Sequence, residues 1–381
     1  MSNYMTLGVI GTSNKENEHR VPIAPGHFSL IAAALRKNIY VEAGYGEMFG
    51  VSDEEIGELV AGIRTREQLF AECDIILLPK PTKEDFPSFK EGQVLWGWPH
   101  CVQGEAITQT GIDKKMTYIA WEEMHIWRSG QWDLHVFQKN NELAGYCSVL
   151  HALQLAGMTG HYGPPKKAAV ISFGSTGRGA IHALQGMGYH DVTVFTKRPY
   201  QALATQIPGL KHRQYQRLPD NENRAGMVTK DGLVSFAAQL SDYDIIVNCI
   251  MQDTDRPLMF IAGDEIDDYR PGSLIIDVSC DEGMGFDFAK PTSFIEPAFK
   301  VGHNVLYYAV DHSPSYLWRA ATHEISLNVI YYLPDVMAGE AAWEANETIR
   351  RSIEMKDGVI QNPKILRFQK RAADYPHKKQ G

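Results

Sequence analysis

Residues 168–180, with the sequence AAVISFGSTGRGA, decide the predicted fold. The stretch opens with an apolar run that shows no alternation of polar residues, as is typical of a parallel strand buried on both faces. A glycine-rich turn follows, and it opens an amphipathic helical segment. Gly174 and Gly177 match the second and third glycines of G-x-G-x-x-G, which binds a dinucleotide when it lies between a strand and a helix.

The residues of this turn suit a pyrophosphate. Glycine at the second position lets the backbone approach the phosphates, glycine at the third lets the helix pack on the strand, and the helix N-terminus attracts the negative charge. Ser172 takes the place of the first glycine, and we expect it to be tolerated there with a negative φ. The predicted phosphate-binding residues are Ser172, Gly174, Ser175, Thr176 and Gly177.

The next predicted strand ends at Thr196-Lys197-Arg198, 24 residues after Ser172. An enzyme that uses NAD normally carries Asp or Glu near this point, where it binds the ribose 2′-hydroxyl. A lysine and an arginine suit a 2′-phosphate instead. The sequence therefore predicts NADP as the cofactor and leaves NAD possible.

Further strands of the same apolar type are predicted at 191–195, 244–247 and 273–278, with helical segments between them. This alternation predicts a doubly wound dinucleotide-binding domain over residues 143–311. A connecting helix is expected over 142–158.

The first 142 residues also alternate between strand and helix patterns. Strands are expected at 6–10, 38–42, 74–78, 94–96 and 116–120, and a helix at 26–37. One long helical region is expected around 313–355, and these residues are expected to pack with the first 142 residues as part of the same domain. The prediction is an α/β protein of two Rossmann-like doubly wound domains separated by an active-site cleft, with residues 1–142 plus 312–381 forming a discontinuous substrate domain.

Three basic residues follow predicted strands of the first half. Arg20 follows the first strand, Lys80 follows the strand at 74–78, and His100 follows the strand at 94–96. Sites in α/β proteins form from loops at the carboxyl ends of parallel strands. Together, these side chains could bind a substrate carboxylate and transfer protons next to a bound nicotinamide.

Composition limits the remaining choices. The 37 Lys and Arg against 46 Asp and Glu give a formal charge of −9, which argues against a nucleic-acid partner or a polybasic membrane contact. Five Cys with no C-x-x-C spacing argue against a disulfide framework, and no metal site is predicted. The N-terminus lacks signal-peptide features, so a cytoplasmic protein is expected. The basic tail, 364–381, is expected to be solvated.

Several segments resemble, in order, the alanine dehydrogenase, transhydrogenase and lysine-forming saccharopine dehydrogenase superfamily. They are EHRVPIAP (18–25), DIILLPKP (74–81), LWGWPH (95–100), AWEE (120–123), NELAGY (141–146), the glycine turn, IIVNCI (245–250) and LIIDVSCDEG (274–283). Within the superfamily, GWPH (97–100), AGY (144–146), LIIDVSCDEG, PTSFIEPAF (291–299) and YYAVDHSPSYLWR (307–319) resemble the N5-(carboxyethyl)ornithine synthases.

The resemblance implies roles for individual residues. Arg20 is similar to the family's substrate-carboxylate clamp, Lys80 to the lysine that contacts the substrate, and His100 to the general acid/base. Asp281 resembles the acidic residue near the nicotinamide and substrate, and Glu122 a substrate-proximal acid. Asn248 and Ile250 match the strand-end loop that lines the cofactor. A homo-oligomer is implied as well.

Departures from the alanine dehydrogenase pattern favour an opine-type reaction. The fuller glycine fingerprint and the acidic ribose-binding residue are missing, and Asn141 and Tyr146 replace the family's Ser and Arg. The predicted enzyme is an NADP-dependent oxidoreductase that joins a 2-oxo acid such as pyruvate to the amine of ornithine or lysine. Reductive amination with ammonia, a saccharopine-type reaction of 2-oxoglutarate with lysine, and a catalytically silent cofactor-binding protein remain alternatives.

Overall fold

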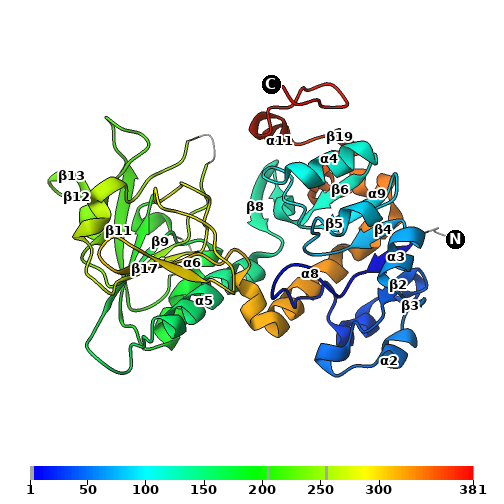
Figure 1. Ribbon diagram of the computed structural model, residues 1–381, viewed down its shortest axis with the longest axis horizontal. Coiled ribbons are helices and arrows are strands. Elements are labelled where there is room, and N and C mark those ends of the chain that lie inside the picture. Colours follow the sequence, from blue (N-terminus) through cyan, green and yellow to red (C-terminus); the bar gives the residue numbers. More distant parts are fainter. Residues whose placement is uncertain (1–3, 204–205, 254–255, 381) are drawn as a thin grey trace. The chain divides into compact units, whose positions relative to one another are not determined.

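The computed structural model describes residues 4–203, 206–253 and 256–380 (Figure 1). Contacts within the chain separate two compact units. Unit 1 comprises Met1–Gln138 and Trp318–Gly381, and unit 2 comprises Lys139–Leu317. Unit 1 is therefore discontinuous in sequence, and unit 2 is inserted into it.

Unit 1 is built on one eight-stranded sheet. Its strands are β1 (Leu7–Val9), β2 (Ile39–Glu42), β3 (Gly62–Arg64), β4 (Ile75–Leu77), β5 (Val94–Gly97), β6 (Thr117–Ala120), β18 (Ile353–Lys356) and β19 (Val359–Ile360). Six of them are parallel, in the spatial order β3-β2-β1-β4-β5-β6, and β18 and β19 extend the edge as antiparallel strands. The strand order reverses between β1 and β4, where open α/β sheets form their binding crevice.

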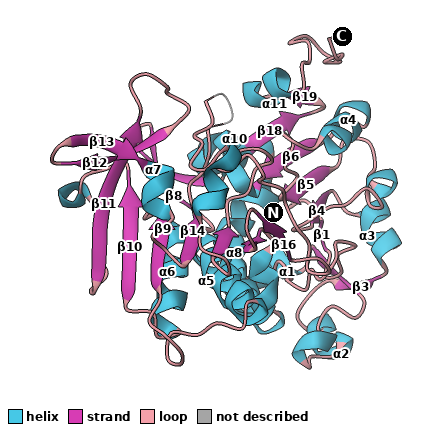
Figure 2. Cartoon of the chain, turned by 60° about the vertical axis from the view of Figure 1, so that its left-hand side comes forward, coloured by secondary structure: helices cyan, strands magenta, loops and turns pink. Residues whose placement is uncertain are grey.

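Helices surround this sheet, and all but α8 are short (Figure 2). They are α1 (Ala33–Arg36), α2 (Asp53–Gly57), α3 (Arg66–Glu72), α4 (Glu105–Asp113), α8 (Trp318–Ala338), α9 (Glu340–Ala345), α10 (Glu347–Ser352) and α11 (Pro363–Phe368), with 3₁₀ turns η1 (Pro25–Leu30), η2 (Glu47–Phe49), η3 (Phe86–Ser88) and η4 (Trp121–Glu123). Strands β7 (His125–Arg128) and β8 (Gln131–His135) form a separate hairpin.

Two predicted helices of unit 1 are corrected by the structure. Residues 26–37 form η1 and the four-residue α1, because Ile31 and Ala32 between them are extended and Ile31 is buried. The region 313–355 is not one helix. The helix ends at Gly339, whose φ is +85°. A second break lies at Asn346, whose side chain caps α10, and β18 follows α10.

Unit 2 contains a nine-stranded sheet. Its strands are β9 (Lys167–Ile171), β10 (Asp191–Thr196), β11 (Leu210–Arg217), β12 (Ala225–Thr229), β13 (Gly232–Ser235), β14 (Ile245–Asn248), β15 (Leu274–Asp277), β16 (Ala298–Val301) and β17 (Val305–Tyr308). The central six are parallel in the order β11-β10-β9-β14-β15-β17, the doubly wound arrangement expected from the sequence. Helices α5 (Gln138–Leu155), α6 (Ser175–Gly186) and α7 (Phe236–Leu240) accompany the sheet, with η5 (Tyr200–Ala202), η6 (Gly263–Asp268) and η7 (Ser313–Leu317).

Apolar strands without alternation are explained by cores on both faces of each sheet. In unit 1, Ile75 and Leu77 pack into one hydrophobic cluster while Ile76 packs into another. In unit 2, Val170 faces one cluster and Ile171 the opposite one. Successive side chains of a strand point to opposite faces, so a sheet covered on both sides requires a continuous apolar run.

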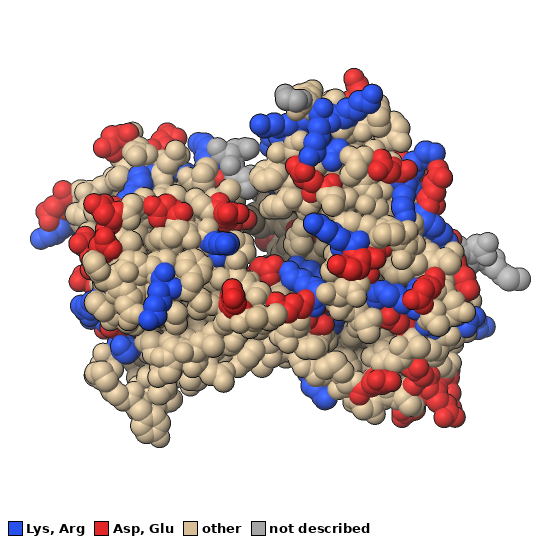
Figure 3. Space-filling model, viewed as in Figure 1, with Lys and Arg blue, Asp and Glu red and all other residues tan. Residues whose placement is uncertain are grey.

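The charged side chains of the C-terminal segment are mostly solvated, as expected, but the segment is also anchored by buried residues. Five of its six basic residues are exposed: Lys364, Arg367, Lys370, Lys378 and Lys379. Gln369, Arg371 and His377 are buried. Gln369 Nε2 donates to the Cys101 carbonyl at 2.6 Å, and Arg371 Nε donates to Gln369 Oε1 at 2.7 Å. Basic side chains do gather around this segment, and charges of both signs are interspersed over the rest of the face in Figure 3. The segment thus supports the loop that follows His100.

No helix within the described ranges combines the length and apolar character needed to cross a bilayer.

Candidate active site

Side chains predicted from separate segments meet in unit 1 where the strand order reverses. Lys80 follows β4 and His100 follows β5, and Lys80 Nζ lies 2.8 Å from His100 Nε2. The ring of Trp98 lies beneath two cations, with the Arg20 guanidinium carbon 5.3 Å and Lys80 Nζ 5.6 Å from its centroid. The structure therefore brings Arg20 and Lys80 over one indole, with His100 in contact with Lys80.

Gly97 explains how the ends of β4 and β5 come so close. A Cβ at this position would lie 1.9 Å from the Leu78 carbonyl oxygen, so only glycine fits. The close approach places the loops that carry Lys80 and His100 side by side.

Arg20 is held by a buried carboxylate. Arg20 and Glu18 are 4% and 7% exposed, and Arg20 Nε donates to Glu18 Oε1 at 2.8 Å. Arg20 Nη2 donates to the other carboxylate oxygen, so the pair is bidentate. Burial alone raises the pKa of Glu18, but the charge and hydrogen bonds of Arg20, with a contribution from Lys80, outweigh it and hold that pKa at about 2. Glu18 is therefore ionised and fixes the guanidinium beside Trp98.

His100 lies in a strained backbone conformation and faces Glu122. Its φ is +49°, which is uncommon for a residue with a side chain and is found often at functional sites. Its amide donates to Glu122 Oε1 at 2.6 Å, and its Nδ1 lies 3.6 Å from the same oxygen. Glu122, in η4 after β6, thus contacts His100 directly. The imidazole lies between an amine at Nε2 and a carboxyl group at Nδ1.

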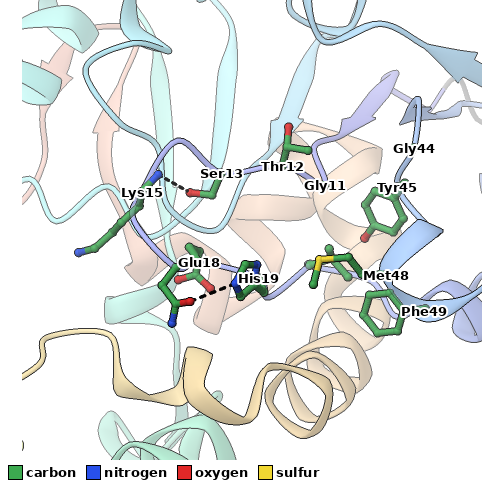
Figure 4. Close-up of a pocket in the computed structure, with 12 residues that line it drawn as sticks. Gly11, Thr12, Ser13, Lys15, Glu18, His19, Gly44, Tyr45, Met48 and Phe49 are labelled. Carbon is green, nitrogen blue, oxygen red and sulfur yellow. Dashed lines mark hydrogen bonds between the residues drawn. The ribbon is translucent and has the colours of Figure 1, made fainter. Parts of the chain in front are cut away.

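A cavity of 260 Å³ in unit 1 is lined in part by Glu18, the ion-pair partner of Arg20 (Figure 4). It is lined by Gly11, Thr12, Ser13, Lys15, Asn17, Glu18, His19, Val21, Gly44, Tyr45, Met48 and Phe49. The loop after β1 forms one wall, because buried Glu42 accepts hydrogen bonds from the amides of Gly11 and Thr12 at 2.7 and 2.8 Å. Lys15 and Glu18 make one end polar, while Tyr45 and Phe49 make the other apolar.

Trp318 and Arg319 close around the apolar end of this cavity. The Trp318 ring contacts Phe49 at 5.0 Å and His19 at 6.4 Å between centroids. Arg319 lies over the Trp318 ring at 4.9 Å and donates to the Met48 carbonyl.

In unit 2, the glycine turn forms a cradle at the N-terminus of α6. Gly174 is the N-cap of that helix, and a Cβ on it would meet only the Ser172 hydroxyl oxygen, at 3.7 Å. A Cβ on Gly177 would lie 2.5 Å from the Ser172 carbonyl oxygen, so this glycine serves the tight turn. A twelve-residue helix with open backbone at its N-terminus fits a pyrophosphate. Ser175 and Thr176 form its first turn.

The expectation of a negative φ at Ser172 is wrong. Its φ is +97°, a conformation that favours glycine. The Ser172 hydroxyl accepts a 3.4 Å contact from the Gly174 amide. Serine therefore occupies the strained position that glycine normally takes in the fingerprint.

Basic side chains gather after β10. The Thr196 hydroxyl donates to the Arg198 carbonyl at 2.6 Å and shapes the loop. Lys197 is exposed, but partial burial of its amine and the nearby charges of Arg217 and Arg256 lower its pKa, against an opposing effect of Asp253. Cations thus outnumber anions around Lys197.

A buried polar network lies at the ends of β14 and β15. Asn248 Nδ2 donates to Asp277 Oδ1 at 2.8 Å, and the Tyr307 hydroxyl donates to Asp277 Oδ2 at 2.8 Å. Burial raises the pKa of Asp277 to about 7. The Ile250 amide donates to Asn248 Oδ1 at 3.3 Å, so both predicted loop residues belong to this network. Burial also raises the pKa of Asp281, four residues after Asp277.

Sequence reasoning missed three residues of these sites. The sequence indicates Glu18 only as part of the segment 18–25, although Glu-x-Arg at 18–20 is a spacing that permits the ion pair. Trp98 gave no signal beyond its place in GWPH, and Asp277 was signalled only by its position at a strand end.

Comparison with known proteins places this geometry in a family. Residues 9–144 match the alanine dehydrogenase/PNT N-terminal domain, and residues 151–363 match the corresponding C-terminal domain. An N(5)-(carboxyethyl)ornithine synthase of Clostridium botulinum is 26% identical over 84% of this chain and 92% of its own length. An alanine dehydrogenase of Mycolicibacterium smegmatis is 24% identical over 92% and 93%.

Solved structures show the same fold. An L-alanine dehydrogenase superposes with a TM-score of 0.74 at 17% identity and covers 96% of this chain and 99% of its own. A transhydrogenase from Sinorhizobium meliloti gives 0.71 at 19% identity, with coverage of 94% and 99%. The chain therefore belongs to the alanine dehydrogenase/PNT family and is an NAD(P)-dependent oxidoreductase of amino acids that acts on CH–NH₂ or CH–NH bonds.

Proposed function

We propose that this oxidoreductase uses NADP to form, or to oxidise, a secondary amine by joining a 2-oxo acid such as pyruvate to the amine of an amino acid such as ornithine or lysine. The observation that carries the proposal is the contact of 2.8 Å between Lys80 Nζ and His100 Nε2 beside Arg20 and Trp98. This set provides a carboxylate-binding cation, a second cation for the oxo group and a proton carrier.

Each side chain has a distinct task in the proposed reaction. Arg20, fixed by Glu18, binds the carboxylate of the 2-oxo acid, and Lys80 polarises the oxo group. The amine nitrogen attacks the oxo carbon and the C–O bond breaks, while His100 carries a proton to the departing hydroxyl group, which leaves as water. The bound nicotinamide supplies the hydride that reduces the imine. Asp281 is proposed to lie near the nicotinamide and substrate.

The cavity lined by Glu18, the partner of Arg20, favours an amino acid over ammonia as the amine. Its 260 Å³ and its lining by both polar and apolar residues suit an aliphatic side chain with a charged end. Ammonia would need no such space. Reductive amination with ammonia is the second candidate, because alanine dehydrogenases of 24% to 26% identity match over more of this chain than the carboxyethylornithine synthase does. A saccharopine-type reaction would use the same residues with a larger oxo acid.

The basic side chains after β10 support NADP. Lys197 and Arg198 lie where the ribose of a bound dinucleotide is expected, with Arg217 nearby. Comparing Michaelis constants for NADPH and NADH tests this part of the proposal. We expect a preference of about tenfold or more for NADPH, and the reverse preference would contradict it.

Variants of Lys80 and His100 test the catalytic assignment. Lys80→Met and His100→Ala should each lower turnover by about 100-fold or more, since general acid–base help is worth at least that much. Lys115→Met is the matched control, because Lys115 is an exposed lysine of unit 1 whose ammonium pairs with the exposed Glu91. Near-normal turnover in both site variants would contradict the assignment. A cytoplasmic homo-oligomer remains a prediction.

A further inference from the structure

Two histidines of the β7–β8 hairpin bind the backbone of the turn that carries Glu122. Strand β8, which ends at His135, is labelled in Figure 1. His135 Nε2 lies 3.2 Å from the Glu122 carbonyl oxygen, and His125 Nδ1 lies 3.0 Å from the Glu123 carbonyl oxygen. Glu122 and Glu123 are the last two residues of η4, so the hairpin holds that turn by its backbone. The reaction proposed above uses neither histidine.

The contacts of His135 determine which of its ring nitrogens carries the proton. The Phe137 amide donates to Nδ1 at 3.0 Å, so Nδ1 is the unprotonated nitrogen. The Glu122 carbonyl can only accept, so Nε2 is the nitrogen that carries the hydrogen. A neutral imidazole in this one tautomer satisfies both contacts, whereas an imidazolium would oppose the Phe137 amide. The ring therefore joins two backbone groups in a fixed direction.

The surroundings of the His135 ring favour the same neutral form. The ring is partly buried and packs against His125 at 5.0 Å and Phe137 at 6.1 Å between centroids. Burial and the nearby His125 lower the pKa of His135 to about 4, and the Glu122 carbonyl opposes that shift only in part. At pH 7 the imidazole is therefore neutral, and aromatic packing limits its movement.

Glu122 connects this turn to His100. Its Oε1 accepts a hydrogen bond from the His100 amide at 2.6 Å and lies 3.6 Å from Nδ1 of the His100 ring. The φ of His100 is +49°, a conformation that persists only where surrounding contacts hold it. On its other side, His100 Nε2 lies 2.8 Å from Lys80 Nζ. A displacement of Glu122 would therefore move the imidazole of His100 relative to Lys80.

We propose that His135 is a positioning residue, whose neutral imidazole holds the Glu122 backbone so that the Glu122 carboxyl group keeps His100 aligned with Lys80. The effect on catalysis rests on the proposed function, whereas the alignment of His100 does not. His135 acts through Glu122 and has no contact of its own with the reacting groups in this proposal. Small displacements of a catalytic group lower reaction rates strongly, so the effect is measurable.

Nitrogen-15 NMR of protein labelled in its histidine rings tests the alignment without an activity assay. At pH 7, His135 should carry its proton on Nε2 alone. His135→Asn keeps an acceptor near the position of Nδ1 and loses the donor to Glu122, so it should shift the ring-nitrogen signals of His100. His135→Gln keeps a donor near the position of Nε2 and should leave those signals close to wild type.

Spectra of His100→Ala and of the His135 variants assign the signals, because each lacks one histidine. His323→Asn is the control, since His323 is an exposed histidine of unit 1 that contacts His27 and Glu324. It should leave the signals of His100 in place. A proton on Nδ1 of His135 in the wild type, or unmoved signals of His100 in His135→Asn, would overturn the proposal.

Steady-state kinetics tests the effect on catalysis. His135→Asn should lower kcat by about tenfold, the effect of one lost hydrogen bond on the reacting geometry, and His135→Gln should restore most of it. Both variants remove the same ring, so urea unfolding should show equal stability for the two. Equal kcat values in the two variants would contradict the positioning role, because a purely structural loss affects both alike. An enzyme inactive on all substrates would refute the proposed function and leave the NMR result decisive.

Discussion

The buried ion pair between Glu18 and Arg20 makes a strong prediction about stability. Its carboxylate has a pKa of about 2 in place of the ordinary 4.5, which at 1.36 kcal/mol per pH unit corresponds to about 3 kcal/mol favouring the ionised form in the folded protein. Glu18→Gln would remove that contribution and leave the Arg20 guanidinium buried without its partner carboxylate, a change that typically costs 3–5 kcal/mol. We therefore expect the free energy of unfolding at pH 7 to fall by about 3 kcal/mol.

Urea unfolding of both proteins across pH would measure this effect. Because the folded-state pKa is lowered, the stabilisation is present above about pH 4.5 and is lost as the pH falls toward about 2. The difference between wild type and Glu18→Gln should narrow over that range. Glu91→Gln, which breaks the exposed pair with Lys115, is the control and should leave stability unchanged.

A double variant separates the charge effect from packing. Glu18→Gln/Arg20→Met removes both buried charges, so it should be more stable than Glu18→Gln alone. A loss below about 1 kcal/mol in Glu18→Gln, or an equal loss for the control, would refute the reasoning.

Three further predictions concern unit 2. Gly179→Ala should lower the free energy of unfolding in urea by about 1–3 kcal/mol, because the added Cβ would lie 1.7 Å from the Glu142 carbonyl oxygen. Gly186→Ala in the same helix is the control: its Cβ would meet nothing within 4 Å, so it should not destabilise the protein. Ser172→Gly should raise the free energy of unfolding by about 1 kcal/mol, since φ at this position is +97°; a decrease would contradict the strain. Asp277→Asn should stabilise the protein more at pH 8 than at pH 5. The folded-state pKa of Asp277 is raised to about 7, so the wild type loses stability as the pH rises toward that value, and the amide variant does not. An equal effect at both pH values would contradict this prediction.

The doubly wound fold is predictable because buried parallel strands need continuous apolar runs. Segments such as 168–171 and 75–78 carry that pattern, and both sheets follow from it. Helix lengths were less predictable, since the break at Gly339 depends on a positive φ and the strand at 353–356 on pairing with β6, which is distant in sequence.

The candidate site was predictable only in part for the same reason. Strand-end positions and family resemblance indicate Lys80 and His100, but the contact between them requires the close approach at Gly97. Likewise, the basic composition of 364–381 gives no indication that Arg371 and His377 are buried.

The most direct test of the central claim is an assay of NADPH oxidation with pyruvate and a panel of amines that includes ammonia, ornithine and lysine. The proposed function predicts that the reduced cofactor is consumed when an amino acid with a second amine is present, that a secondary amine dicarboxylate accumulates, and that His100→Ala abolishes the reaction. Turnover with ammonia alone, and alanine as the product, would contradict it.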